Sequence, residues 1–234
     1  MYAILLAGYK DSGKTELAVS LCRQLREMGY SVSAVKFSHH GLDRSGSDTQ
    51  RLTQAAGAAG AIDPESTHLS WSGQWSLLDL LPRLSSQVLI LEGGKHLRCL
   101  PRIILPREAG EVNQLSQELG IAQWGGPSGT GLTRIQDTGQ AASLVLQQGF
   151  LLPDLDCGGC GRQDCFQLAR EIVAGGADFS QCSALSQESI EVSVNGTPVP
   201  LNPFVKELIR NTLQGMFSSL KGMGSGEIQV RIGS

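Results

Sequence analysis

The 234-residue chain lacks the features that mark membrane and nucleic-acid-binding proteins. Its N-terminal apolar run, "MYAILLAG", is too short to cross a membrane and lacks the basic start of a secretory signal peptide. Its 19 Lys and Arg do not outnumber its 22 Asp and Glu, so it has no positive field to attract nucleic acid or an anionic membrane. It also has no internal repeat and no low-complexity tract. We therefore expect a cytoplasmic protein without nucleic-acid or membrane partners.

The pattern of strands and helices predicts an α/β fold. Hydrophobic residues make up 41% of the chain, enough for a buried core, and 29 glycines indicate many tight turns. Short apolar runs alternate with amphipathic segments, which implies a mostly parallel sheet flanked by helices. Strands are expected at 2–8, 31–38, 87–94, 101–108 and 120–126, and helices at 14–29, from 48, at 75–86 with a break at Pro82, at 110–119 and at 138–150.

The composition changes abruptly at "LLPDLD", where a segment rich in Cys, Gly and Asp begins. Beyond it, Asn195-Gly196 predicts a hairpin, and Asn202 followed by Pro203 predicts the start of a helix. That helix has an apolar stripe, which fits either a face packed on its own sheet or a docking surface. A last strand is expected at 227–233. The expected units are a P-loop nucleotide-binding domain at 1–150, a four-cysteine segment at 151–186 and a small α+β module at 187–234.

The segment "GYKDSGKT" matches the phosphate-binding pattern G-x-x-x-x-G-K-[ST] without a gap. The match lies between a predicted buried strand and an amphipathic helix, the context that this loop requires. Its backbone N–H groups would surround phosphate oxygens, Lys14 would reach the β- and γ-phosphates, and the Thr15 hydroxyl would bind Mg²⁺. The predicted nucleotide-binding residues are Gly8, Asp11, Ser12, Gly13, Lys14, Thr15 and Glu16.

Two absences restrict the class of this loop. ATPases that act as deviant-loop dimers carry a lysine directly after the first glycine, where this chain has Tyr9. This argues against the ATP-driven metal-insertion and partitioning dimers. The chain also has no N-K-x-D segment, so no local motif selects guanine over adenine.

Three blocks in order resemble the molybdopterin-guanine dinucleotide biosynthesis protein B (MobB) family. They are "GYKDSGKTEL", "VKFSHHGLDRSGSDTQRLTQ" and "VLILEGGKHLRCLPRIIL", and the resemblance covers about the first 140 residues. It implies a GTP-binding α/β protein, usually a homodimer, with weak GTPase activity. Such a protein would assist the attachment of a nucleotide to molybdopterin, with a separate nucleotidyltransferase or a molybdenum or tungsten enzyme as partner.

The same resemblance gives candidate catalytic residues besides Lys14. Glu92 and Asp48 would bind the metal or orient the attacking water. A solvated strand end for Glu92 and a helix N-cap for Asp48 remain alternatives. Lys95 and His96 face either the pterin or a phosphate, or belong to a solvated turn.

The strand end "VKFSHHG" brings further basic groups to this region. His39 and His40 follow Lys36 and could contact an anionic ligand at the carboxyl edge of the sheet, or form a structural loop. A metal site between two adjacent histidines is disfavoured, because neighbours on a strand point to opposite faces. Gly94 stands where the family often has an aromatic residue, which we expect to change what packs over the site.

Four cysteines in the second segment can supply four thiolates. Cys157, Cys160, Cys165 and Cys182 have only one C-x2-C pair, whereas zinc ribbons normally have two. The segment "CGGCGRQDCFQLAREIVAGGADFSQC" resembles the small [4Fe–4S] modules of corrinoid iron–sulfur proteins and electron-transport subunits. A [4Fe–4S] cluster is therefore expected, with zinc or a redox-active dithiol as alternatives. Cys22 is expected in the core, and Cys99 is given no role.

These features support a GTP-binding accessory protein of molybdenum or tungsten cofactor biosynthesis that carries a cluster. The alternative is a nucleotide-gated metallochaperone or electron-transfer protein. A non-enzymatic adaptor that binds a target enzyme through its C-terminal module is a third reading.

Overall fold

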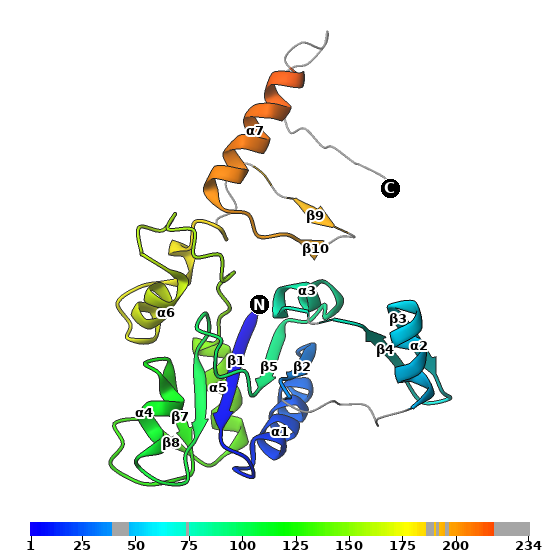
Figure 1. Ribbon diagram of the computed structural model, residues 1–234. Helices are drawn as coiled ribbons and strands as arrows, with labels where there is room; N and C mark the ends of the chain where they lie inside the picture. The colour runs from blue at the N-terminus through cyan, green and yellow to red at the C-terminus, as the bar shows by residue number, and fades with distance from the viewer. Residues whose placement is uncertain (39–46, 74, 186–189, 191, 195–196, 218–234) are drawn as a thin grey trace.

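The computed structural model describes residues 1–38, 47–73, 75–185, 190, 192–194 and 197–217, and Figure 1 shows their arrangement. Six strands form one parallel sheet in the order β2-β5-β1-β6-β7-β8. Their bounds are β1 Tyr2–Gly8, β2 Val32–Lys36, β5 Val88–Glu92, β6 Arg102–Leu105, β7 Gly120–Trp124 and β8 Arg134–Ile135. The predicted α/β fold with a mostly parallel sheet is confirmed. No helix among these residues is long and apolar enough to span a bilayer.

One face of the sheet is covered by two long helices. Ile4 and Leu6 of β1 pack with Leu17, Leu21 and Leu25 of α1 (Lys14–Glu27). The helix α5 (Thr138–Gln148) contributes to the same cluster. Because the α1 leucines recur every four residues, they lie on one face of the helix, which packs on the sheet. Each buried leucine stabilises the fold by about 1.5–3 kcal/mol.

The cysteine segment packs on the opposite face of the sheet. Ala3 and Leu5 of β1 share a buried cluster with Leu168 of α6 (Cys165–Val173) and with the thiols of Cys165 and Cys182. The short helix α3 (Leu77–Leu80) also contributes to this cluster. The helix α4 (Glu111–Ser116) covers the end of the sheet nearest the phosphate loop. The sheet and the cysteine segment therefore share one core.

Several local expectations needed correction. Ser47, not Asp48, caps α2 (Asp48–Ala56), because its hydroxyl accepts from the backbone N–H of Gln50. The helix expected at 75–86 is short: a capping box between Ser76 and Asp79 starts α3, and η1 (Leu81–Arg83) follows as a 3₁₀ turn. Two features were not predicted: the strand β8 and an antiparallel hairpin of β3 (Ala58–Ile62) with β4 (Thr67–Trp71), which follows α2.

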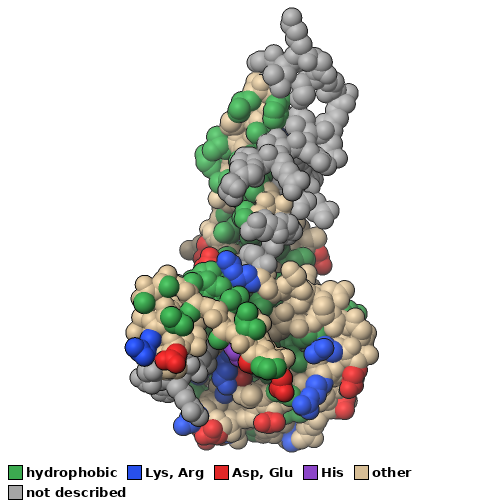
Figure 2. Space-filling model, turned by 90° about the vertical axis from the view of Figure 1, so that its right-hand side faces the viewer, with side chains coloured by type: hydrophobic (Ala, Val, Ile, Leu, Met, Phe, Trp, Pro, Cys, Tyr) green, Lys and Arg blue, Asp and Glu red, His purple; other side chains and the backbone are tan. Residues whose placement is uncertain are grey.

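The C-terminal module is described in part. The strands β9 (Ser193–Val194) and β10 (Thr197–Pro198) pair antiparallel, as the hairpin expectation requires, while its turn and the strand expected at 227–233 lie outside the described residues. Asn202 caps α7 (Pro203–Phe217) as predicted, accepting from the N–H of Val205. This helix projects away from the sheet (Figure 1), and hydrophobic side chains remain visible along it (Figure 2). Phe204 is 72% exposed, so its side chain is not in the core.

Arg102 of β6 is fully buried, although an arginine is costly to remove from water. Its guanidinium donates to the carbonyls of Lys95 (2.9 Å), Leu97 (2.7 Å) and Leu115 (3.0 Å). Burial and the nearby Arg98 lower the pKa of Arg102 to about 10, so it keeps its charge at neutral pH. One side chain thus ties the 95–97 loop to α4.

Replacing Arg102 by leucine is expected to lower the free energy of unfolding by about 2–4 kcal/mol, because two buried carbonyls and one partly buried carbonyl lose their donor. Urea denaturation measures the change. Arg134→Leu is the matched control, since Arg134 lies on β8 of the same sheet but is exposed. Equal stability of the two variants would contradict the role given to Arg102.

Candidate functional site

The predicted phosphate loop joins β1 to α1 at the carboxyl edge of the sheet. Two of its residues take left-handed backbone conformations, Asp11 (φ 62°) and Gly13 (φ 84°). Gly8 has no room for a side chain, because an added Cβ would lie 2.3 Å from the Ser12 hydroxyl. The loop therefore turns back sharply, and Gly13 caps α1 with its backbone. This is the shape that directs backbone N–H groups at an anion.

Lys14 is half-buried inside this loop. Its ammonium donates to the backbone carbonyl of Tyr9 and lies 3.5 Å from the Ser12 hydroxyl. Burial lowers the pKa of Lys14, while the carboxylate of Glu92 opposes the change. Lys95 and Lys36 are close enough to lower it further. Three ammonium groups therefore lie near two carboxylates, those of Glu92 and Asp11, and the excess of positive charge favours an anion at this edge.

Thr15, Glu92 and Lys36 meet directly at the carboxyl ends of β2 and β5. The Thr15 hydroxyl donates to Glu92 Oε1 at 2.8 Å, and Lys36 Nζ lies 3.0 Å from the same oxygen and 3.4 Å from Thr15 Oγ1. The parallel register sets this geometry, since Lys36 and Glu92 are Cα partners. A cation already lies against both oxygens, and hydroxyl and carboxylate oxygens are ligands that Mg²⁺ prefers. The residues therefore fit a magnesium ion.

The turn after β5 explains the glycine at position 94. Gly93 (φ 81°) and Gly94 (φ 69°) are both left-handed, and a Cβ on Gly94 would lie 2.7 Å from the Phe37 ring. Phe37 also packs edge-on against the ring of His96, with 5.4 Å between ring centroids. An aromatic ring is thus present over this turn, but it comes from β2's end.

The remaining predicted residues are Asp48, Glu16 and the histidine pair. The Asp48 side chain is 92% exposed, and its ion pair is with Arg51 at 3.5 Å. Within the described part of the chain, Asp48 makes no hydrogen bond or ion pair with Lys14, Thr15 or Glu92. Glu16 is exposed on the first turn of α1. His39 and His40 lie outside the described residues.

Arg162 holds the parts of the cysteine segment together. Its guanidinium donates to the Cys160 carbonyl (2.9 Å), to Glu171 of α6 (2.8 Å) and to the side chain of Gln181 (2.7 Å), the residue before Cys182. Gly159 lies close to the segment that follows Cys182, because a Cβ added to it would be 2.5 Å from the Ser183 hydroxyl. The Cys157–Cys160 loop is therefore held beside Cys182.

The two buried thiols receive backbone hydrogen bonds. Burial raises the pKa of Cys165 to about 11, and the N–H groups of Asp156 and Leu155 directed at its sulfur oppose this. Cys182 is similar: burial raises its pKa, while N–H groups of Leu185 and Ala184 lower it. N–H groups aimed at sulfur favour the thiolate, the form that binds metal.

No group of three or more His, Cys, Asp or Glu side chains in the described ranges is arranged as a ready metal site. The donor set nevertheless fits a thiolate-bound centre. Cys157 and Cys160 are close enough to Cys182 to raise its pKa, as Cys182 is to Cys165. Gly158 (φ 67°) and Gly161 (φ 79°), which directly follow Cys157 and Cys160, take the left-handed conformations that this loop requires. Four thiols, two of them with N–H donors, suit an iron–sulfur cluster or zinc.

Cys99 has a position that the sequence did not reveal. It is 1% exposed and packs in the same cluster as Cys165. Burial, then Asp154 and Cys165, raise its pKa to about 12, so the thiol is protonated at neutral pH. Its carbonyl accepts from the N–H of Leu152 at 2.9 Å. The loop that starts at Glu92 therefore ends in contact with the cysteine segment, which no local motif indicates.

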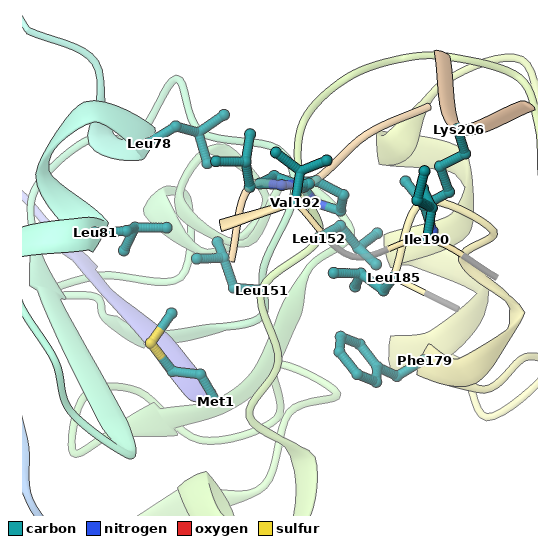
Figure 3. A pocket seen from close by; sticks show the side chains of 14 residues that line it. Met1, Leu78, Leu81, Leu151, Leu152, Phe179, Leu185, Ile190, Val192 and Lys206 are labelled. Atoms are coloured by element: carbon teal, nitrogen blue, oxygen red, sulfur yellow. The ribbon is translucent and has the colours of Figure 1, made fainter. Parts of the chain in front are cut away.

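A separate apolar cavity of about 550 Å³ lies where three parts of the chain meet (Figure 3). Leu81 points into it from the sheet domain, Leu151 and Phe179 from the cysteine segment and Val192 from the C-terminal module. Lys206 is the charged residue among its described lining, which contains no carboxylate, thiol or imidazole.

Two family models and a curated relative match the sequence of this chain. The sequence model of the family "Molybdopterin guanine dinucleotide synthesis protein B" (MobB) matches residues 3–122. A second model, "Putative Fe-S cluster", matches residues 152–184. A Methanocaldococcus jannaschii relative named "Putative molybdopterin-guanine dinucleotide biosynthesis adapter protein" is 26% identical, over 99% of this chain and 97% of its own length.

Solved structures support the same fold. A crystal structure of Bacillus subtilis MobB has a TM-score of 0.51 at 20% identity, covering 64% of this chain and 99% of that chain. A second structure of that protein gives 0.50 at 21% identity with the same coverage. The family match spans more than half of the chain, from the strand that leads into the phosphate loop to β7. The chain therefore belongs to the molybdopterin guanine dinucleotide synthesis protein B family.

Proposed function

We propose that this protein is a GTP-binding accessory factor of molybdopterin guanine dinucleotide biosynthesis, with weak GTPase activity and a [4Fe–4S] cluster. The observation that carries the proposal is the contact of Thr15 with Glu92 beside Lys14, in a chain of this family. It acts in the cytoplasm as a homodimer. Its partners are the molybdopterin nucleotidyltransferase and a molybdenum or tungsten enzyme that receives the cofactor.

The residues divide the work at the phosphate loop. Loop N–H groups and Lys14 bind the phosphates, and Lys14 leaves the Tyr9 carbonyl to do so. Thr15 and Glu92 would hold Mg²⁺, whose charge would offset that of the β- and γ-phosphates. Lys36 would have to leave Glu92 to free this carboxylate, and Glu92 or Asp48 would orient the attacking water. Turnover is slow without a partner, because within the described ranges no arginine contacts Lys14, Thr15 or Glu92, where it could stabilise the transferred phosphoryl group.

Cys157, Cys160, Cys165 and Cys182 hold the cluster, and its chemistry is one-electron transfer or redox sensing. Zinc at the same thiolates would instead give a structural clamp. A second function, nucleotide-gated electron or metal delivery, is favoured by one observation: the loop that starts at Glu92 ends at Cys99, packed near Cys165. In that case the nucleotide state would control the cluster.

Reconstitution tests the accessory role. Purified nucleotidyltransferase, molybdopterin and Mg·GTP are combined with and without this protein, and dinucleotide product is measured by chromatography. We expect product yield or transfer into the apo-enzyme to rise when this protein is present. In parallel, competition against a fluorescent GTP analogue should show displacement by GTP and not by ATP. No effect on yield or transfer would contradict the accessory function.

Replacing Glu92 by glutamine is expected to lower Mg²⁺-dependent GTP hydrolysis by about a hundredfold, because a neutral amide cannot hold the metal or orient water as a carboxylate does. Phosphate release at saturating GTP measures the change. Glu27→Gln, an exposed acid at the opposite end of α1, is the control and should hydrolyse normally. Unchanged hydrolysis in Glu92→Gln would remove Glu92 from the site.

A further inference from the structure

Another cavity, of about 450 Å³ and with a polar lining, lies between the sheet domain and α6. Its lining consists of Lys95, His96, Arg98, Gln117, Glu118 and Phe166. The first three residues come from the loop after β5, the next two follow α4, and Phe166 comes from the cysteine segment. The cavity therefore depends on both parts of the chain.

The cavity is positively charged. Lys95 Nζ lies 4.1 Å from the Tyr9 ring centroid, and Arg98 Cζ lies 3.8 Å from that of Phe166. Within the described part of the chain neither cation has a carboxylate partner, so aromatic faces hold their positions without cancelling their charge. Glu118, the one acid in the lining, is paired with Arg170. Two uncompensated cations therefore face this space.

The walls are held in place from beneath. The buried Arg102 donates to the carbonyls of Lys95 and Leu97, which belong to one wall. It also donates to the carbonyl of Leu115, which lies two residues before the second wall begins in the sequence. On that second wall Gln117 (φ 45°) and Glu118 (φ 62°) are consecutive left-handed residues, although neither is glycine. Strained backbone that surrounding structure maintains is concentrated at ligand sites. The cavity is thus a preformed feature and not a gap between loose side chains.

Its position places it next to the nucleotide. Lys95 stacks on Tyr9 of the phosphate loop and is close enough to Lys14 to lower the pKa of that lysine. On the other side, Phe166 is adjacent in sequence to Cys165. A ligand in this cavity would lie between the phosphate loop and the cysteines.

We propose that this cavity binds the phosphate monoester of the pterin substrate, with Lys95 and Arg98 as phosphate donors and the Arg98–Phe166 stack beside the planar ring. The identity of the ring rests on the proposed function, whereas the phosphate assignment rests on the charges described above. A dianionic phosphate accepts charge-assisted hydrogen bonds from both cations. The guanidinium plane of Arg98 also suits a flat heteroaromatic ring.

A matched pair of fluorescent probes tests the site: 6-hydroxymethylpterin phosphate and unphosphorylated 6-hydroxymethylpterin. Binding to the full-length protein is measured by fluorescence anisotropy. The phosphate ester should bind at least tenfold more tightly than the parent pterin. Arg98→Gln and Lys95→Gln should each weaken it by about tenfold to a hundredfold, the expected effect of losing one charge-assisted hydrogen bond. Arg83→Gln is the control, because Arg83 also stacks on aromatic rings, those of Trp71 and Trp75, but lies outside the cavity.

Two further measurements separate this site from the nucleotide site. Lys14→Ala should leave binding of the pterin phosphate unchanged, and GTP should not displace it. If Lys14→Ala abolishes pterin-phosphate binding, the ligand occupies the phosphate loop and the proposal is overturned. Equal affinity for the two pterins, or for inorganic phosphate and the ester, would overturn the pterin-phosphate assignment. Lys95→Gln keeps the test decisive if Arg98→Gln disturbs the cysteine segment. If the parent protein binds the pterin phosphate but not GTP, only the proposed nucleotide function is refuted.

Discussion

Replacing Cys160 by serine is expected to abolish cluster binding, reducing about four iron and four sulfide per chain in anaerobically purified protein to near zero. In the proposed function the four thiols form the ligand set, and Arg162 fixes the Cys160 carbonyl relative to α6 and Gln181. A serine hydroxyl is a poor substitute for thiolate as an iron ligand. Iron, zinc and acid-labile sulfide analysis with a visible spectrum measures the loss.

Cys22→Ser is the matched control, because Cys22 lies on α1 in the cluster of the other sheet face. It should keep its iron and its visible absorption. Finding one zinc per chain and no visible absorption in the parent protein would overturn the cluster and leave a structural clamp. Full iron retention in Cys160→Ser would show that another ligand completes the set.

Replacing Lys14 by alanine is expected to weaken GTP binding by about a hundredfold, or ~3 kcal/mol. In the present structure the ammonium is half-buried and is held by the loop's own carbonyl, so it is pre-positioned for phosphate. Its removal takes away a charge that burial makes stronger. Titration of a fluorescent GTP analogue gives the affinity directly.

Lys10→Ala is the control, since Lys10 lies in the same loop but is exposed. It should change affinity by less than about threefold, as expected for an exposed charge. Lys14→Ala should also lose any stimulation of dinucleotide formation. If it loses GTP binding and still stimulates, the protein acts as an adaptor without nucleotide chemistry.

The features that sequence reasoning found are those encoded locally. The apolar run 88–91 and the spacing of Leu17, Leu21 and Leu25 determine a strand and a helix face on their own. The phosphate loop is similarly local, because its glycines, Lys14 and Thr15 are consecutive. Thr15 and Glu92 could be paired in advance only through the family resemblance, and the parallel register confirms that they meet.

The features that were missed depend on distant parts of the chain. Arg102 looks like any strand residue until its partners at 95, 97 and 115 are known. Cys99 gains its position only when residues 150–184 fold over the sheet. The β3–β4 hairpin was hidden by the Ala- and Gly-rich sequence at 55–61, which has neither strand periodicity nor a strong turn signal. The alternative of Asp48 as an N-cap was wrong, because the helix begins at Asp48 itself and the hydroxyl of Ser47 accepts from the N–H of Gln50.

The shared core has a practical meaning for where this protein can be divided. A protein shortened at residue 150, where the composition changes, would leave Leu5, Leu89 and Leu91 in water, because their cover includes α6 and the cysteines. An uncovered row of strand leucines is a patch prone to self-association. Removal of the cysteine segment would therefore lower solubility as well as remove the thiols. Point substitutions at the thiols separate the two effects.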